Sequence, residues 1–275
     1  MVVSMLLLSN RCGADQLLHW QQQLKNLNIE IIPKFEASFG SKVLTQYQEP
    51  LFIVDEKGLW LAANGMRMQP DWVGQLARLK RASHKNELIA RACQTEQQPV
   101  IIDATAGLGH DGLLLAWLGA KVNLIERHPV LFALLSDAYQ TAMQHPALAA
   151  TMQRVQLVHG EASDYLAQMQ RQGKKVDVVY LDPMFPKGGH KEAKKQAQVK
   201  KEMQILHYLL PDHAGMDLGE YLLPLAKQVA PRVIIKRPRH AAPLTADMPQ
   251  HQWLGDACRF DGYFQPALQL KNSQL

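Results

Sequence analysis

The chain has 275 residues, which is enough for one large domain with a smaller one attached. Hydrophobic residues make up 47% and charged residues 20%, a balance that excludes a chain dominated by disorder, and no apolar run is long enough to cross a membrane. The net charge of +5 favours a polyanionic partner without proving one. The three cysteines are widely spaced and no secretory signal is recognised, so we expect a cytoplasmic protein without a metal centre.

The first 70 or so residues predict short strands, turns and one helix. A strand is expected at 1–8, a helix at 16–26, and a hairpin from strands at 51–54 and 59–62. The polar segment Gln69-Pro70-Asp71 then marks a boundary. We therefore predict a small N-terminal α+β domain over residues 1–72.

From residue 73 onward, apolar strands alternate with amphipathic helices. The predicted strands are 100–103, 121–126, 155–159, 176–182 and 232–236, and the predicted helices are 111–117, 129–144, 163–171 and 218–228. This alternation predicts an α/β domain over residues 73–275, Rossmann-like, with a mostly parallel sheet and helices on both faces. Ligands of such sheets bind beyond the carboxyl ends of the strands.

A glycine-rich loop follows the first strand of this second region. Asp103 ends the strand, and Gly107, Gly109 and Gly112 form a G-x-G-x-x-G pattern at the start of the next helix. The next strand ends in Glu126, where an acidic residue accepts hydrogen bonds from ribose hydroxyls. This order of elements favours a nucleotide-type cofactor over a turn that merely needs glycine.

Two classes of cofactor use a loop of this kind. A dinucleotide such as NAD places its pyrophosphate at the helix N-terminus, where the carboxylates of Asp103 and Asp111 would repel it. The same carboxylates attract the α-ammonium group of S-adenosylmethionine. The loop therefore favours S-adenosylmethionine, and an NAD-dependent oxidoreductase remains the alternative.

The strand at 176–182 runs directly into a stiff loop that carries chemical groups. Asp182 is followed by Pro183, Met184, Phe185 and Pro186, and the prolines fix the backbone. Such a loop can hold a carboxylate and a carbonyl against the N–H groups of an exocyclic base amine while Phe185 stacks on the base. Orientation of this kind contributes as much as ~7–11 kcal/mol in favourable cases. We predict Asp182, Pro183 and Phe185 as catalytic residues, with Asp182 a candidate general base; the alternative is a proline-bounded turn with Phe185 in the core.

These motifs together resemble one known family, the bacterial ribosomal RNA small subunit methyltransferase J family, over about residues 80–260. The loop from Asp182 to Phe185 is similar to the D/N-P-P-Y/F motif of amino methyltransferases and departs from it at Met184. The other segments that carry the resemblance are 103–111, 126–129, 199–203 and 236–238. The first 70 residues match the family only loosely.

The resemblance implies a class I methyltransferase fold, S-adenosylmethionine as cofactor, and the 2-amino group of a guanine in 16S rRNA as methyl acceptor. Carried over by position, the family's cofactor contacts are His110, Asp111, Glu126, Arg127, Glu161, Ala162 and Asp182. Together with Asp103, Gly107 and Gly109 of the loop, they form the predicted cofactor site. Position 110 is often arginine in the family, so a guanidinium contact there would be lost whereas a backbone contact would survive.

Basic residues follow the Asp182 loop and indicate where RNA phosphates would bind. The predicted RNA-binding residues are Lys187, Lys191, Lys194, Lys195, Lys200, Lys201, Lys236 and Arg237. The alternative for the run is a solvated helix face. The partner expected is 16S rRNA or the small ribosomal subunit, with the target base unpaired or flipped out.

The residue chemistry alone identifies an amino group of a base and not which base carries it. An adenine-N6 enzyme or one that acts on another nucleic acid therefore remains an alternative, as does a non-catalytic RNA-binding protein. Only the family resemblance selects guanine in rRNA. The sequence predicts no oligomeric state.

Overall fold

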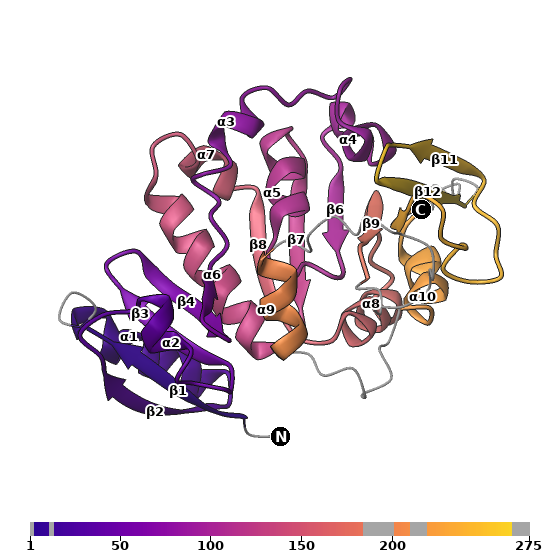
Figure 1. Ribbon diagram of the computed structural model, residues 1–275. Coiled ribbons are helices and arrows are strands. Elements are labelled where there is room, and N and C mark those ends of the chain that lie inside the picture. The colour runs from indigo at the N-terminus through magenta and orange to yellow at the C-terminus, as the bar shows by residue number, and fades with distance from the viewer. Residues whose placement is uncertain (1–2, 11–13, 184–200, 210–218, 266–275) are drawn as a thin grey trace. The chain divides into compact units, whose positions relative to one another are not determined.

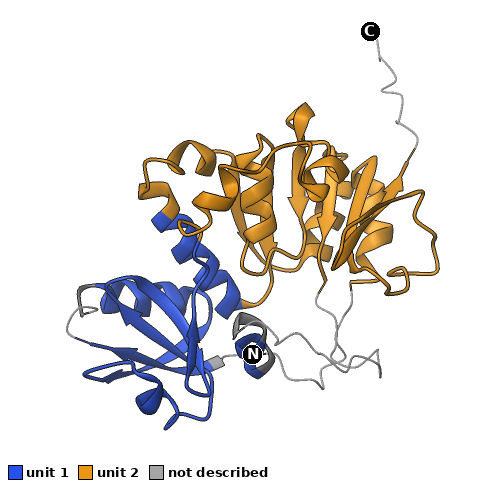
Figure 2. Ribbon diagram, turned by 45° about the horizontal axis from the view of Figure 1, so that its top comes forward, with its two compact units in different colours: residues 1–71, 129–141, 185–216 blue, residues 72–128, 142–184, 217–275 orange. Residues whose placement is uncertain are grey.

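The computed structural model describes residues 3–10, 14–183, 201–209 and 219–265. The chain divides into two compact units, coloured separately in Figure 2. Unit 1 contains residues 1–71, 129–141 and 185–216, and unit 2 contains 72–128, 142–184 and 217–275. The N-terminal region is thus grouped with two later segments of the chain, while the assignment of domains to 1–72 and 73–275 remains a prediction.

Unit 1 is built on a five-stranded sheet of order β2-β1-β3-β4-β5. The strands are β1 (Val3–Ser9), β2 (Ile29–Phe35), β3 (Leu51–Asp55), β4 (Gly58–Ala63) and β5 (Met66–Met68). The helices of this unit are α1 (Ala14–Asn26), α2 (Ser41–Leu44), most of α6 (Pro129–Gln144) and α9 (Lys201–Leu209). Strand β1 pairs in parallel with β2 and β3, because the chain passes through α1 and α2 before it returns to the sheet.

The hairpin predicted from the sequence is present between β3 and β4. Asp55 pairs with Gly58, whose φ of +107° suits glycine. The Asp55 carboxylate accepts hydrogen bonds from the backbone N–H of Lys57 and the Trp60 indole, and forms an ion pair with Arg67 at 3.1 Å. The whole of β3 is buried, which explains the unbroken apolar sequence from Leu51 to Val54.

Unit 2 is built on a seven-stranded sheet of order β11-β12-β10-β9-β6-β7-β8 (Figure 1). The strands are β6 (Val100–Asp103), β7 (Lys121–Glu126), β8 (Val155–His159), β9 (Val178–Leu181), β10 (Arg232–Pro238), β11 (His251–Leu254) and β12 (Cys258–Phe264). The helices are α3 (Leu76–Leu79), α4 (Leu88–Ala92), the 3-10 helix η2 (Thr95–Gln97), α5 (His110–Trp117), α7 (Ala149–Met152), α8 (Ala162–Arg171) and α10 (Leu222–Val229). Strands β6 to β10 are parallel, β12 pairs antiparallel with β10, and β11 forms the edge antiparallel to β12.

Residues of the central strands alternate between the two faces of this sheet. Val179 and Leu181 of β9 join an apolar cluster with α8 and α10. Tyr180, between them, points to the other face and donates to Asp111 of α5. The predicted α/β fold with helices on both faces is confirmed. The antiparallel pair β11–β12 was not predicted, and β9 is shorter than the predicted 176–182.

Candidate functional site

The loop after β6 is fixed between neighbouring strands. The N–H of Ala104 donates to the Tyr180 carbonyl and the N–H of Ala106 to the Ile125 carbonyl, both at 3.0 Å. Asp103 is 2% exposed and accepts a bond from the Thr105 N–H, and burial raises its pKa well above the ordinary value. These contacts hold the loop at the carboxyl ends of β6, β7 and β9.

Two glycines of the loop have left-handed backbones, which few other residues adopt. Gly107 has a φ of +55° and Gly109 a φ of +73°. Gly112 lies in α5, where an added Cβ would stand 2.2 Å from Leu124 Cδ2. The G-x-G-x-x-G pattern therefore serves the turn with its first two glycines and close helix–strand packing with its third.

Glu126 at the end of β7 is tied to the glycine loop. One of its carboxylate oxygens accepts the Gly107 N–H at 2.8 Å and the other accepts the His128 N–H at 2.7 Å. Burial raises the pKa of Glu126, and these two hydrogen bonds oppose the rise. Each oxygen has a second lone pair, so the predicted role as acceptor for hydroxyl groups is compatible with these contacts.

Arg127 and Glu161 lie at the ends of β7 and β8 and form an ion pair at 3.7 Å. Their side chains are about half exposed, so the pair contributes little to stability. Ala162 begins α8 and is buried. The structure thus brings these three predicted cofactor contacts to the same sheet edge as Glu126.

The end of β9 carries a charged cluster that joins three elements. The Lys236 ammonium of β10 contacts Asp111 Oδ2 of α5 and Asp182 Oδ2 after β9, each at 2.8 Å. The Tyr180 hydroxyl donates to the same Asp111 oxygen at 2.7 Å. The Asp182 N–H donates to Thr105 Oγ1 at 2.6 Å, which anchors the predicted catalytic motif to the glycine loop.

The pKa values in this cluster reflect burial opposed by one cation. Burial acts to raise the pKa of Asp111, but Lys236 and Tyr180 outweigh it and the pKa is lowered. Burial raises the pKa of Asp182, with Lys236 opposing and Asp111 adding to the rise. Burial acts to lower the pKa of Lys236, and the two carboxylates reverse this to a net rise. Lys236 therefore stays an ammonium ion throughout the physiological pH range.

Several predicted residues fall outside the described part of the chain. These are Phe185, Lys187, Lys191, Lys194, Lys195 and Lys200. Lys201 is the first residue of α9. Pro183, directly after Asp182, is buried.

Lys236 and Arg237, predicted as phosphate contacts, have protein partners. Lys236 contacts the two carboxylates described above. Arg237 is 7% exposed, and its Nε and Nη2 donate to the Ala242 carbonyl at 3.0 and 2.7 Å. The sequence could not indicate this, because a basic residue at a strand end has the same appearance whether its partner is a phosphate or the fold.

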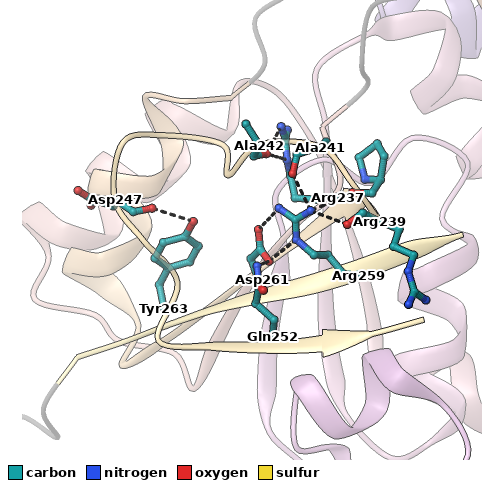
Figure 3. A network of polar contacts seen from close by, with 10 residues as sticks. Arg237, Arg239, Ala241, Ala242, Asp247, Gln252, Arg259, Asp261 and Tyr263 are labelled. Carbon is teal, nitrogen blue, oxygen red and sulfur yellow. Dashed lines mark hydrogen bonds and ion pairs between the residues drawn. The ribbon is translucent and has the colours of Figure 1, made fainter. Parts of the chain in front are cut away.

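Arg237 belongs to a second polar network, on the strands β10 and β12 (Figure 3). Arg259 donates through Nε and Nη2 to the Asp261 carboxylate at 2.8 and 3.0 Å. Its Nη1 donates to the carbonyls of Pro238, Arg239 and Ala241. This network fixes the start of the loop that follows β10.

The carboxylates at this sheet edge favour a cationic ligand over an anionic one. Asp103, Asp111, Asp182 and Glu126 surround the glycine loop, and Lys236 is the ammonium paired with two of them. That donor set fits the ammonium and hydroxyl groups of S-adenosylmethionine and opposes a pyrophosphate. The described residues include no cluster of three or more potential metal ligands, and no described helix is long and apolar enough to cross a membrane.

Known proteins similar to this chain share its length and its fold. The family model for SAM-dependent methyltransferases matches residues 43–265. Ribosomal RNA small subunit methyltransferase J of Acinetobacter baylyi is 54% identical, over 91% of this chain and 94% of that protein. The protein of the same name from Laribacter hongkongensis is 45% identical, over 84% and 82%. A SAM-dependent methyltransferase from Neisseria gonorrhoeae has a crystal structure similar to this one, with a TM-score of 0.70 and 27% identity, over 94% and 96% of the two chains.

Proposed function

We propose, from the premise that the chain belongs to the ribosomal RNA small subunit methyltransferase J family of SAM-dependent methyltransferases, that it methylates the exocyclic 2-amino group of a guanine in 16S rRNA. The relatives carry the small-subunit rRNA in their names. The Asp182 carboxylate, presented beside the glycine loop, is the observation that supports an amine acceptor. The substrate location makes the cytoplasm the expected compartment.

Asp182 has the position and chemistry to orient a weakly nucleophilic amine. Its Oδ2 is held by Lys236, and its backbone N–H is held by Thr105. The carboxylate accepts one N–H of the guanine amine and turns the nitrogen lone pair toward the methyl donor. When bound, S-adenosylmethionine supplies an electrophilic methyl group on a positively charged sulfur. Asp182 or water accepts the proton that the methylated nitrogen releases.

The cofactor contacts are proposed on the same residues that line the sheet edge. Glu126 would accept hydrogen bonds from the ribose hydroxyls, and the buried carboxylate of Asp103 would interact with the amino-acid end of the cofactor. Gly107 and Gly109 allow the backbone to approach the cofactor closely. His110, Arg127, Glu161 and Ala162 complete the proposed site.

Transfer of a tritiated methyl group tests this function directly. Full-length protein is incubated with labelled S-adenosylmethionine and with 16S rRNA, supplied free or in 30S subunits from cells that lack the enzyme. Digestion and chromatography then identify the labelled nucleoside. We expect N2-methylguanosine. Label in N6-methyladenosine would overturn the choice of base, and no label in either RNA despite measurable cofactor binding would overturn rRNA as the substrate.

A further inference from the structure

The Lys236 ammonium links the cofactor loop to the acceptor loop. It contacts Asp111 on the helix after the glycine loop and Asp182 at the start of the catalytic motif. We infer that Lys236 is a positioning residue, which fixes Asp182 Oδ2 so that Oδ1 is presented to the acceptor amine. The inference rests on the proposed function for the identity of that amine.

The sheet register places Lys236 beside Asp182. Strands β9 and β10 are parallel, with Ile234 opposite Tyr180 and Ile235 opposite Leu181. The next residues are Lys236 in β10 and Asp182 directly after β9, so both side chains follow the face used by Tyr180. On the other side, Lys236 pairs with Phe260 of β12, which is 5% exposed. The lysine therefore extends from a rigid strand that is paired on both sides, which limits its freedom to leave the carboxylates.

The hydrogen bonds of the cluster distinguish the two oxygens of Asp182. In the part of the chain that the structure describes, Lys236 contacts Asp182 through Oδ2 alone. The Asp182 side chain is 34% exposed, so the carboxylate is accessible to a ligand. An amine hydrogen accepted at Oδ1 would leave the contact between Lys236 and Oδ2 unbroken.

One cation here serves two carboxylates that otherwise repel each other. In the described part of the chain, Asp111 and Lys236 act on Asp182, and Asp103, Tyr180, Cys258 and Arg78 each interact with at least one of these three groups. Of these, Lys236 is the group that opposes the burial-driven rise in the pKa of Asp182. Without it, Asp182 would protonate at a higher pH and become a weaker acceptor for the amine hydrogen, because the charge-assisted hydrogen bond is lost.

A phosphate contact and a positioning role predict different defects for the same substitution. Loss of a phosphate contact weakens RNA binding and lowers the salt dependence of binding by about one unit of slope. Loss of a positioning residue lowers kcat while KM for RNA and its salt dependence stay the same. Both oxygens that Lys236 contacts belong to the protein, which favours the second outcome.

The test compares Lys236→Met and Lys236→Arg with the control Lys121→Met, an exposed lysine at the start of β7. Methyl transfer to 30S subunits is measured from pH 5.5 to 9. For Lys236→Met we expect kcat to fall on the order of 100-fold and the acid limb of its pH profile to move to higher pH. Lys236→Arg should return the limb toward its wild-type position because it restores the charge. Lys121→Met should match the wild type.

Two measurements separate this inference from the proposed function. A wild-type protein that leaves guanine unmethylated refutes the proposed function, and the titration of the aspartate carboxyls by ¹³C NMR in wild type and Lys236→Met then tests the inference alone. An unchanged Asp182 titration or an unshifted acid limb in folded Lys236→Met would overturn it. A raised KM for RNA with kcat intact would instead establish the phosphate contact.

Discussion

Two charged clusters flank β10 in unit 2, and they differ in how completely their groups are paired. Arg259 and Asp261 are 5% and 0% exposed, and all three nitrogens of the guanidinium donate to protein oxygens. Lys236 shares one ammonium between two carboxylates, and the three side chains are 21–34% exposed. In the Arg259 cluster every guanidinium nitrogen has a protein partner. In the Asp182 cluster, partly exposed carboxylate oxygens can still accept hydrogen bonds.

The difference indicates separate roles for similar chemistry. A buried pair whose partners are all within the protein has no atom left for a ligand, and its loss exposes a charge to an apolar interior. A partly exposed cluster with more carboxylates than cations retains lone pairs and a perturbed pKa, which are the properties of sites that bind or react. We therefore assign the Arg259 cluster to the loop after β10 and the Asp182 cluster to the reaction.

The largest effect on activity is expected at Asp182. Asp182→Asn keeps the shape of the side chain but removes the charge and the capacity to take up a proton, so kcat should fall about 10²–10⁴-fold. Cofactor affinity, measured by calorimetry, should change far less. The matched control is Asp164→Asn, an exposed aspartate of α8. If Asp182→Asn kept the wild-type kcat, the Asp182 cluster would have no part in the reaction, and the functional difference between it and the Arg259 cluster would be refuted.

The largest effect on stability is expected at Arg259. Arg259→Met leaves the Asp261 carboxylate buried without its guanidinium partner, which should cost about 3–5 kcal/mol of unfolding free energy. Urea denaturation measures this loss, and Arg171→Met on the exposed end of α8 is the control. The double variant Arg259→Met with Asp261→Leu should recover part of the loss, because no buried charge remains. A loss below about 1 kcal/mol is typical of surface pairs. It would contradict the interpretation that Arg259 and Asp261 form a buried, fully paired cluster.

Another buried carboxylate, Asp137 of α6, extends the comparison to a group that forms no ion pair with any of the described residues. It accepts the Leu59 N–H at 3.0 Å in unit 1, and burial raises its pKa to about 6, with Asp55 adding to the rise. Because the folded state holds this proton more tightly than the unfolded state, the contribution of Asp137 to stability is complete below about pH 4. It is lost as pH rises through about 6.

Asp137→Asn should remove this pH dependence. The variant keeps an oxygen for the Leu59 N–H but cannot ionise, so it should gain stability relative to wild type as pH rises from 4 to 7, by roughly 3 kcal/mol at most. Urea denaturation at several pH values measures the difference. Asp164→Asn, which changes an exposed carboxylate, is the control. A constant difference between Asp137→Asn and wild type across this range would show that Asp137 keeps an ordinary pKa.

Local patterns predicted most of the fold of unit 2. Strands β6, β7 and β8 and helix α6 begin and end where their apolar periods predict, because a strand or helix with one buried face carries that period in its sequence. The pair β11–β12 was missed because β11 begins with the polar residues His251 and Gln252, and β12 has Arg259, Asp261 and Gly262 between its apolar residues. Membership of unit 1 was also beyond local reasoning, since 129–141 joins it only through tertiary packing.

At the candidate site, too, the local sequence predicted only some of the residues. Residues at strand ends, such as Asp103, Glu126 and Asp182, were predicted because parallel strands bring their carboxyl ends to one edge. Thr105 and Tyr180 were missed, since nothing in their local sequence distinguishes them from turn and core residues. Lys236 was noticed for its charge but given an RNA partner, because its neighbours Asp111 and Asp182 lie 125 and 54 residues away in the chain. Partners so distant in sequence become evident only from the register of β9 and β10.

The smallest effect is expected from a substitution that tests how closely α5 must pack against β7, next to the cluster of Lys236, Asp111 and Asp182. Gly112→Ala adds a Cβ that would lie 2.2 Å from Leu124 Cδ2 and 3.5 Å from Asp103 Oδ2, so the buried Leu124 side chain and α5 must move apart. Overpacking of this kind costs about 1–3 kcal/mol, and cofactor affinity should fall because the glycine loop moves with the helix. Denaturation and calorimetry measure the two effects. Gly40→Ala, which has open space and a φ of −67°, is the control, and Gly112→Ala with Leu124→Val should restore both properties. Failure of this second substitution to restore affinity would show that the added methyl group acts on the carboxylate of Asp103 and not through the packing of α5.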